Sequence, residues 1–344
     1  MISILSDAKH NASSNKRTEN FNGIDLVKFF CAILVFIIHI SPVQNPISEF
    51  SKNVLYGLKH GLCRIAVPFY FVCSGFFLFN KMPLYELNTE RVKHYCYKIL
   101  RLVGIWHVLL FIGGTGHLWY LGATVIAVIL LSVFLFVGVR FRYICVSACL
   151  LYAIGLLGDA YYGVIEPLSK ITVFNYLLKG YDFAFSTTRN GVFMGFPFVL
   201  MGAIFSQYRF GLKPKNALAG FVISVLCLLT EAFLLKYNDI PKDNNMYICL
   251  IPVAFFMFSF ATSVRLTDRA IYKHLRRIGV LVYFLHMLIN EFVWLGISVI
   301  NKLLGIELTD YQFIISLGCT LIFAMFIEWL SCKEKFKWIN LVLS

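Results

Sequence analysis

One apolar stretch near the N-terminus, residues 24–42, holds three polar side chains that could take part in chemistry. Asp25, Lys28 and His39 stand there among Phe, Ile, Leu and Val. At about 100° per residue, a helix places Lys28 about 60° from Asp25 and brings His39 back to within about 20° of Lys28. An imidazole exchanges a proton near neutral pH. We therefore predict that His39 is catalytic, with Asp25 and Lys28 on the same face as further candidates or, alternatively, as a paired anchor at the helix start.

Further ionisable residues interrupt apolar stretches later in the chain. Glu231, His286 and Glu291 each lie inside such a stretch, and His117 begins another, followed by Trp119. Ionisable groups inside a membrane are candidates for proton transfer or substrate binding, although both histidines suit a packing or hydrogen-bonding role equally well. The histidines come from separate stretches without the spacing of metal ligands, so we predict no metal site.

Two cations, Lys98 and Arg101, lie three residues apart and therefore on one side of a helix. Such a pair can anchor a helix end at the inner membrane face. It can equally clamp the phosphate groups of a ligand. The sequence leaves both interpretations open.

The composition indicates which solvent surrounds these residues. Of the 344 residues, 59% are hydrophobic and only 14% are charged, whereas soluble domains have about 45–50% and about 25%. A bilayer core about 30 Å thick is crossed by roughly 20 apolar residues. We therefore predict an all-α integral membrane protein, a polytopic bundle of about ten transmembrane helices. The ten stretches are 24–42, 62–80, 95–113, 118–138, 142–158, 190–207, 216–236, 246–264, 278–300 and 311–331.

The distribution of Lys and Arg predicts the orientation of this bundle. If the N-terminus is inside, 21 of the 31 Lys and Arg fall on inner segments and nine on outer ones, which favours cytoplasmic termini. The same bias explains the net charge of +13 without a nucleic-acid partner. Residues 1–20 then form a polar cytoplasmic tail, and residues 21–344 form one transmembrane domain in contact with the lipid bilayer. Residues 159–189 form the longest outer loop, either a place where a polar ligand is met or a solvated cover.

Taken with their neighbours, these residues resemble acyltransferase family 3 of integral membrane proteins. The spacing of Lys28 and His39 matches the family's basic residue, ten residues and histidine, and Lys98-x-x-Arg101 is a looser counterpart of its Arg-x-x-Arg motif. The resemblance runs in order over residues 21–331. It includes the segments Arg64-Ile-Ala-Val-Pro-Phe-Tyr-Phe-Val-Cys-Ser-Gly, His117-Leu-Trp-Tyr-Leu, Arg189-Asn-Gly-Val-Phe and Tyr283-Phe-Leu-His.

This resemblance implies an enzyme of the plasma or inner membrane, an acyltransferase of groups other than aminoacyl groups. Members of the family move an acyl group, commonly acetyl, from cytoplasmic acyl-CoA to a hydroxyl of an envelope glycan or a small molecule. The resemblance assigns His39 as the central catalytic residue and assigns Lys98 and Arg101 to acetyl-CoA or another acyl-CoA. Lys98 departs from the family pattern, because lysine cannot form the bidentate fork of arginine. The candidates for substrate binding are Arg64, His117, Trp119, Arg189, Glu231 and His286.

A narrower similarity supports a second hypothesis. The segments Gly158-Asp-Ala-Tyr-Tyr-Gly-Val-Ile, Thr230-Glu-Ala-Phe-Leu-Leu and Ile240-Pro-Lys-Asp-Asn-Asn-Met-Tyr resemble the membrane domain of vancomycin-resistance serine racemases. That domain is associated with serine supply rather than with acylation. The chain would then be a small-solute uptake domain for an amino acid such as L-serine, without the soluble racemase half. Glu231, Glu291 and His286 would serve as its proton or substrate sites.

Overall fold

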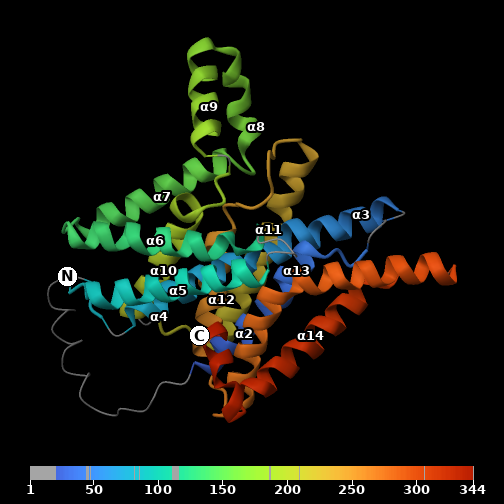
Figure 1. Ribbon diagram of the computed structural model, residues 1–344. Coiled ribbons are helices and arrows are strands. Elements are labelled where there is room, and N and C mark those ends of the chain that lie inside the picture. Colours follow the sequence, from blue (N-terminus) through green and yellow to red (C-terminus); the bar gives the residue numbers. More distant parts are fainter. Residues whose placement is uncertain are drawn as a thin grey trace.

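In a computed structural model, all regular structure of the described residues is helical, which confirms the predicted all-α class (Figure 1). The structure describes residues 21–43, 46, 48–80, 82–84, 86–110, 116–185, 187–208, 210–305 and 307–343; the predicted tail, residues 1–20, lies outside them. The longer helices are α2 (Asn22–His39), α3 (Glu49–Tyr56), α4 (Ala66–Phe79), α5 (Thr89–Leu109), α6 (Trp119–Phe136), α7 (Phe141–Leu157), α9 (Thr172–Ala184), α10 (Phe196–Gln207), α11 (Pro214–Tyr237), α12 (Leu250–Ser263), α13 (Ile271–Leu304) and α14 (Gln312–Ser331). Shorter helical turns are η1 (Gly57–Gly61), η2 (Leu62–Ile65), η3 (Gly116–Leu118), α8 (Tyr162–Ile165), η4 (Glu166–Lys170), η5 (Gly191–Gly195), η6 (Thr309–Tyr311), η7 (Glu334–Ile339) and α15 (Asn340–Leu343).

Within the described chain, six helices are long and apolar enough to cross a membrane, or seven if one bent pair counts as a span. The protein is therefore a multi-pass membrane protein, but the predicted number of ten spans is not confirmed. The six are Asn22–His39, Glu49–Phe79, Gly116–Phe136, Pro214–Tyr237, Ile271–Leu304 and Thr309–Ser331, and the bent pair joins Phe141–Leu157 to Tyr162–Lys170 at 83°.

The other predicted spans form helices that fall short for two physical reasons. α5 occupies most of the stretch 95–113 but carries Lys93, Lys98 and Arg101, and hydrocarbon disfavours such charges. α12 has only 14 residues and rises about 21 Å, less than the bilayer core of about 30 Å. The combined helix Gly191–Gln207 is short as well. The ten predicted spans are therefore not confirmed by helix length and composition.

The stretch 159–189, predicted as a loop, is largely helical. α8, η4 and α9 cover most of it, and α8 and α9 project from the top of the bundle in Figure 1. No side chain of α9 is buried. A helix of 13 residues is too short to appear in the sequence as an apolar run of about 20 residues.

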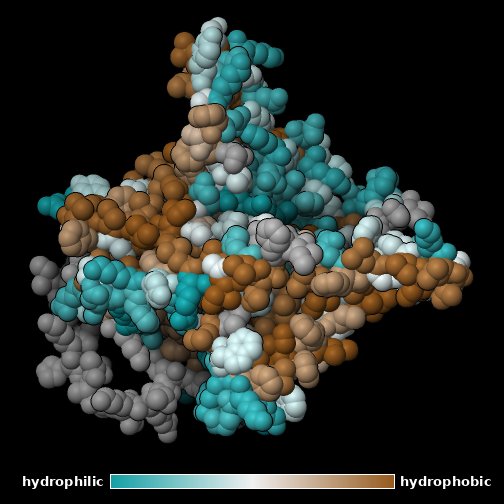
Figure 2. Space-filling view, viewed as in Figure 1, coloured by the Kyte–Doolittle hydropathy of each residue, from teal (hydrophilic) through white to brown (hydrophobic). Residues whose placement is uncertain are grey.

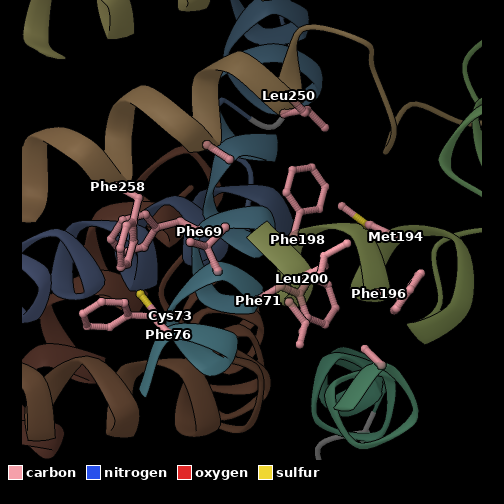
Figure 3. Close-up of a cluster of buried hydrophobic side chains, with 14 of the residues drawn as sticks. Phe69, Phe71, Cys73, Phe76, Met194, Phe196, Phe198, Leu200, Leu250 and Phe258 are labelled. Carbon is pink, nitrogen blue, oxygen red and sulfur yellow. The ribbon is translucent and has the colours of Figure 1, made fainter. Parts of the chain in front are cut away.

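The core forms where α4 crosses α10, because glycines let the two backbones touch. A Cβ atom on Gly75 would lie 2.0 Å from the carbonyl oxygen of Val199, and one on Gly202 would lie 2.0 Å from that of Val72. Small residues at a helix crossing permit such close packing inside a membrane. Aromatic side chains of α4, α10 and α12 fill the space around the crossing in Figure 3. They include Phe69, Phe71, Phe76, Phe198 and Phe258.

The outside of the bundle is also apolar over wide areas. In Figure 2, brown covers α6 and α7 on one side and α13 and α14 on the other, whereas teal gathers in the upper part of the view, between α9 and α3. Ile126 on α6 and Phe326 on α14 are about half exposed. Lipid tails cover such apolar side chains without a penalty in free energy. The surface that faces the membrane therefore needs few charged residues.

The crossing of α4 and α10 leads to a first prediction. In Gly75→Ala or Gly202→Ala, the new methyl group meets a carbonyl oxygen of the opposite helix. We expect each variant to lose about 1–3 kcal/mol of stability, seen as a lower melting temperature of the purified protein in detergent. Gly104→Ala in α5 is the control, because nothing lies within 4 Å of the added atom. Equal losses in all three variants would contradict the close crossing.

Candidate active site

Three histidines from distant parts of the chain meet at one place. His39 ends α2, His117 lies in η3 and His286 lies in the middle of α13. The ring centroid of His286 is 5.2 Å from that of His39 and 5.0 Å from that of His117, and the His39 and His117 centroids are 6.2 Å apart. His117 and His286 are buried, whereas His39 is exposed. Among the three rings, His39 is therefore the most open to an entering molecule.

His39 and His117 line a pocket that also holds most of the predicted substrate-binding residues. Its cavity volume is about 30 Å³, room for a few water molecules or one small functional group. His286 does not line the pocket and lies behind the other two rings. Six further polar or aromatic residues complete the wall: Arg64, Trp119, Tyr120, Arg189, Asn245 and Tyr283.

Contacts with the backbone determine which ring nitrogen of His286 carries the proton. The Nδ1 atom of His286 lies 3.1 Å from the carbonyl oxygen of Val282 and 2.8 Å from that of Tyr283. Since both partners are acceptors, Nδ1 carries the proton, and the buried Nε2 has no hydrogen-bond partner among the described residues. The hydroxyl of Tyr283 donates to the carbonyl oxygen of His117 at 2.6 Å. α13 thereby holds η3, and the His117 ring with it, against the pocket.

Two arginines reach the pocket from interruptions of regular helix. Arg64 lies in η2, and Arg189 lies just before η5. Nη1 of Arg64 donates to Oδ1 of Asn245 at 2.6 Å, and Nη1 of Arg189 donates to the same oxygen at 3.3 Å. Nη2 of Arg64 also donates to Nδ1 of His60 at 3.2 Å, and the Arg189 guanidinium stands 4.9 Å from the centre of the Trp119 ring, a cation–π contact. Both arginines thus converge on one amide oxygen.

Asp159, in the turn between α7 and α8, fixes the orientation of that amide. Its Oδ1 accepts from the backbone N–H groups of Asn245 and Met246 at 2.7 and 3.0 Å, and its Oδ2 accepts from Nδ2 of Asn245 at 3.1 Å. Since the amide nitrogen faces the carboxylate, the amide oxygen must face the arginines. Burial raises the pKa of Asp159 to about 6, so the carboxylate is largely ionised at neutral pH.

A row of hydroxyl groups leads from the pocket into the bundle. The hydroxyl of Tyr120 lies 3.1 Å from Oγ of Ser74, and the Tyr120 ring is 5.8 Å from that of Tyr70. The Tyr70 hydroxyl donates to the carbonyl oxygen of Lys28 at 2.7 Å. Because Lys28 precedes His39 by eleven residues of α2, the row covers about 16 Å along that helix.

The predicted cations lie beyond the far end of this row. Nη1 of Arg276 is 3.6 Å from Oδ2 of Asp25, while Nζ of Lys28 stands 4.5 Å from the centre of the Phe77 ring. Partial burial, followed by the neighbouring Arg101 and Arg276 cations, lowers the pKa of Lys98. Lys98 and Arg101 thus lie near Arg276, which itself pairs with Asp25, and such a group of cations favours binding of an anion.

Two glutamates of the sequence analysis lie outside the pocket. Glu231 accepts hydrogen bonds from the Tyr161 hydroxyl at 2.7 Å and from the backbone N–H groups of Ile248 and Cys249 at 2.6 and 2.8 Å. Glu231 therefore connects α11 to the start of α12, where the first backbone N–H groups of the helix need hydrogen-bond acceptors. Glu291, expected to be buried, is exposed on α13. In the described chain, no group of three His, Cys, Asp or Glu is arranged to hold a metal ion.

Neither Asn245 nor Tyr120 was predicted from the sequence to belong to the site. Asn245 belongs to a polar segment, 238–245, between two apolar stretches, and asparagine is common in such turns for conformational reasons. Its contact with Asp159 joins residues 86 positions apart. No local signal distinguishes it from its neighbour Asn244.

Comparisons with known proteins confirm both resemblances. A family model described as an acyltransferase domain matches residues 21–105. Two proteins of Enterococcus faecalis, each named amino-acid racemase, are 29% identical to the chain over 72% and 92% of its length, and over 37% and 47% of their own. A serine/alanine racemase of Enterococcus gallinarum is 29% identical over 77% of the chain and 40% of its own length. The chain thus spans less than half the length of these relatives. No solved structure matches it significantly.

The contact between Asp159 and Asn245 generates a second prediction. In Asp159→Asn, an NH₂ group replaces the oxygen that faces Nδ2 of Asn245, and we expect a loss of about 1–3 kcal/mol, measured as a lower melting temperature of the purified protein. The control is Asp182→Asn, which breaks a half-exposed ion pair of 2.6 Å with Lys242 and should cost less than about 1 kcal/mol. Similar melting temperatures for the two variants would count against the role of Asp159.

Proposed function

We propose that this protein is an integral membrane O-acyltransferase. It would move an acyl group, acetyl in the first instance, from cytoplasmic acyl-CoA to a hydroxyl of an envelope glycan or a small molecule. The observation that carries the proposal is the position of His39, which lines a polar pocket and lies inside the segment similar to acyltransferase domains. The proposal includes a place in the cell membrane and cytoplasmic termini.

The groups around His39 suit acyl transfer. Its imidazole would take the proton of the acceptor hydroxyl, whose oxygen attacks the carbonyl carbon of the thioester. The oxyanion formed there needs a donor in a site with little water, and Tyr120, which carries a hydroxyl, is among the residues that line the same pocket. When the carbon–sulfur bond breaks, the protonated His39 returns the proton to the departing thiolate. His39 therefore ends the reaction in the state in which it began.

The cations near Asp25 suit the other end of the donor. Lys98, Arg101 and Arg276 would bind the phosphate groups of CoA. The thioester arm would then follow the row of hydroxyl groups past Lys28 towards His39. Asp25, which is paired with Arg276, acts in this scheme by holding that arginine and not by touching the reacting atoms.

A second candidate function is uptake of an amino acid. The relatives named amino-acid racemase and serine/alanine racemase favour it, as do the two arginines in the pocket. The match covers less than half of those proteins, so their racemase activity is not carried over. A transporter has no reason to consume acyl-CoA, and release of free thiol therefore separates the two candidates.

The role of His39 gives the central prediction. In His39→Gln the side chain still forms hydrogen bonds but accepts no proton, so release of free thiol from acetyl-CoA should fall by about 10²–10⁴-fold. The assay uses purified protein in vesicles with a hydroxyl acceptor. Binding of acetyl-CoA should not change. His94→Gln, at an exposed position of α5, is the control. If His39→Gln turned over acetyl-CoA as fast as the unchanged protein, His39 would not be the general base.

The donor end gives a separate prediction. Arg101→Glu reverses one charge beside Lys98 and should weaken CoA binding by about 10- to 100-fold, the effect of a hydrogen bond to a charged group. Arg140→Glu reverses an exposed charge at the start of α7 and should leave the affinity within about twofold. The measurement is equilibrium binding of CoA. Equal effects would mean that the pair is only an anchor at the membrane face.

A further inference from the structure

We infer that the acceptor is a small molecule with a carboxylate, which Arg64 and Arg189 bind while its hydroxyl faces His39. The acyl-transfer part of this inference rests on the proposed function. The carboxylate-binding part stands on the geometry of the two arginines and can be tested without any acyl donor.

The first observation is that the two guanidinium groups have no carboxylate partner. Neither lies within 4.0 Å of a carboxylate among the described residues, where the ion pairs involve other side chains. The Nε atoms of both arginines are buried and lack a hydrogen-bond partner. Both arginines are partly buried, and charges withdrawn from water are normally paired. Two cations at one pocket without a carboxylate partner therefore indicate a place for an anion.

The second observation is the kind of group that holds the arginines. The oxygen of Asn245 positions both guanidinium groups but carries no net charge, so it orients them without neutralising them. Asp159 reaches only the far side of this amide. A carboxylate in place of Asn245 would have paired with the arginines and closed the site. The network therefore leaves N–H donors for a ligand.

The charge of the network favours a monoanion. Arg64, Arg189 and the nearby Lys59 carry three positive charges, and the carboxylates of Asp159 and Asp243 offset two of them. The remaining charge matches a carboxylate better than a phosphate dianion. The small cavity, about 30 Å³, also favours the planar carboxylate, whose two oxygens match the fork of an arginine.

Binding of the carboxylate at the two arginines fixes how the acceptor is oriented in the pocket. Arg64, Arg189 and His39 line one pocket, so a molecule bound through its carboxylate at the arginines presents a hydroxyl a few atoms away to the imidazole. The transferred acyl group forms an ester with that oxygen, the proton passes through His39, and CoA leaves as the thiol. Small hydroxy acids, including hydroxyl-bearing amino acids, have this arrangement.

The test measures binding to the full chain in nanodiscs without acyl-CoA. The probes are radiolabelled L-serine and L-lactate, and the competitors are unlabelled ethanolamine, which is serine without its carboxylate, and inorganic phosphate. We expect both probes to bind and ethanolamine to compete at least about tenfold more weakly than unlabelled serine. Equal competition by ethanolamine, or failure of both probes to bind, overturns the inference. Phosphate binding more tightly than either probe overturns the choice of a carboxylate and with it the inference.

Variants connect the binding to the arginines. Arg189→Gln should weaken binding of L-serine by about 10- to 100-fold. Arg189→Lys keeps the charge but loses the fork, so its affinity for L-serine should lie between that of Arg189→Gln and that of the unchanged protein. Arg142→Gln is the matched control, because Arg142 also stands over an aromatic ring, 4.7 Å from the centre of Tyr143, but is exposed elsewhere. Equal affinities of Arg189→Gln and Arg142→Gln overturn the inference.

One further variant separates this inference from the proposed function. His39→Gln should still bind L-serine through the carboxylate contacts with Arg64 and Arg189, although it loses the contact of the hydroxyl with the imidazole. If serine binds through Arg189 but no thiol is released from acetyl-CoA, the proposed acyltransferase function is refuted, whereas the carboxylate-binding site is supported. If thiol is released with acceptors that lack a carboxylate as fast as with serine, the inference fails and the acyltransferase stands.

Discussion

The pocket depends on a single buried contact, the one between the carboxylate of Asp159 and the amide of Asn245. Three hydrogen bonds to the carboxylate determine which side of the amide carries the oxygen, and that oxygen positions Arg64 and Arg189. Together with the two arginines, the contact joins four segments that are far apart in the chain. Inside a low-dielectric protein such a network is stable only when its members are satisfied together. An anion at the two arginines would complete it.

Interruptions of regular helix put the charged groups of the pocket where they are. η1 is a π-helical turn and η2 a 3₁₀ turn, and together they present Arg64 at the start of α4. η5 is a second π-helical turn, begun by Asn190, whose side chain accepts from the N–H groups of Val192 and Phe193. Such turns are common at functional sites. Inside a membrane they are tolerated because neighbouring protein satisfies the free backbone groups.

α2 gives the molecule two chemically different ends. Its first turn carries Asp25 beside Arg276, and its last residue, His39, reaches the pocket. Tyr70 and Tyr120 lie between the two ends and keep polar groups inside an otherwise apolar bundle. The helix itself fixes the distance between its two ends, because its rise per residue is constant.

The all-helical membrane class, the positions of most helices and the common face of Lys28 and His39 could be predicted from the sequence, because these follow from local composition and a period of 3.6 residues. The number of ten spans is not confirmed, because α5 carries charges and α12 is short. How the helices pack brings His39, His117 and His286 together, places Glu231 at α12 instead of the pocket, and lets Asp159 orient Asn245. These contacts join residues tens to hundreds of positions apart. Their geometry arises from helix packing, which glycines such as Gly75 and Gly202 permit and which no local pattern encodes.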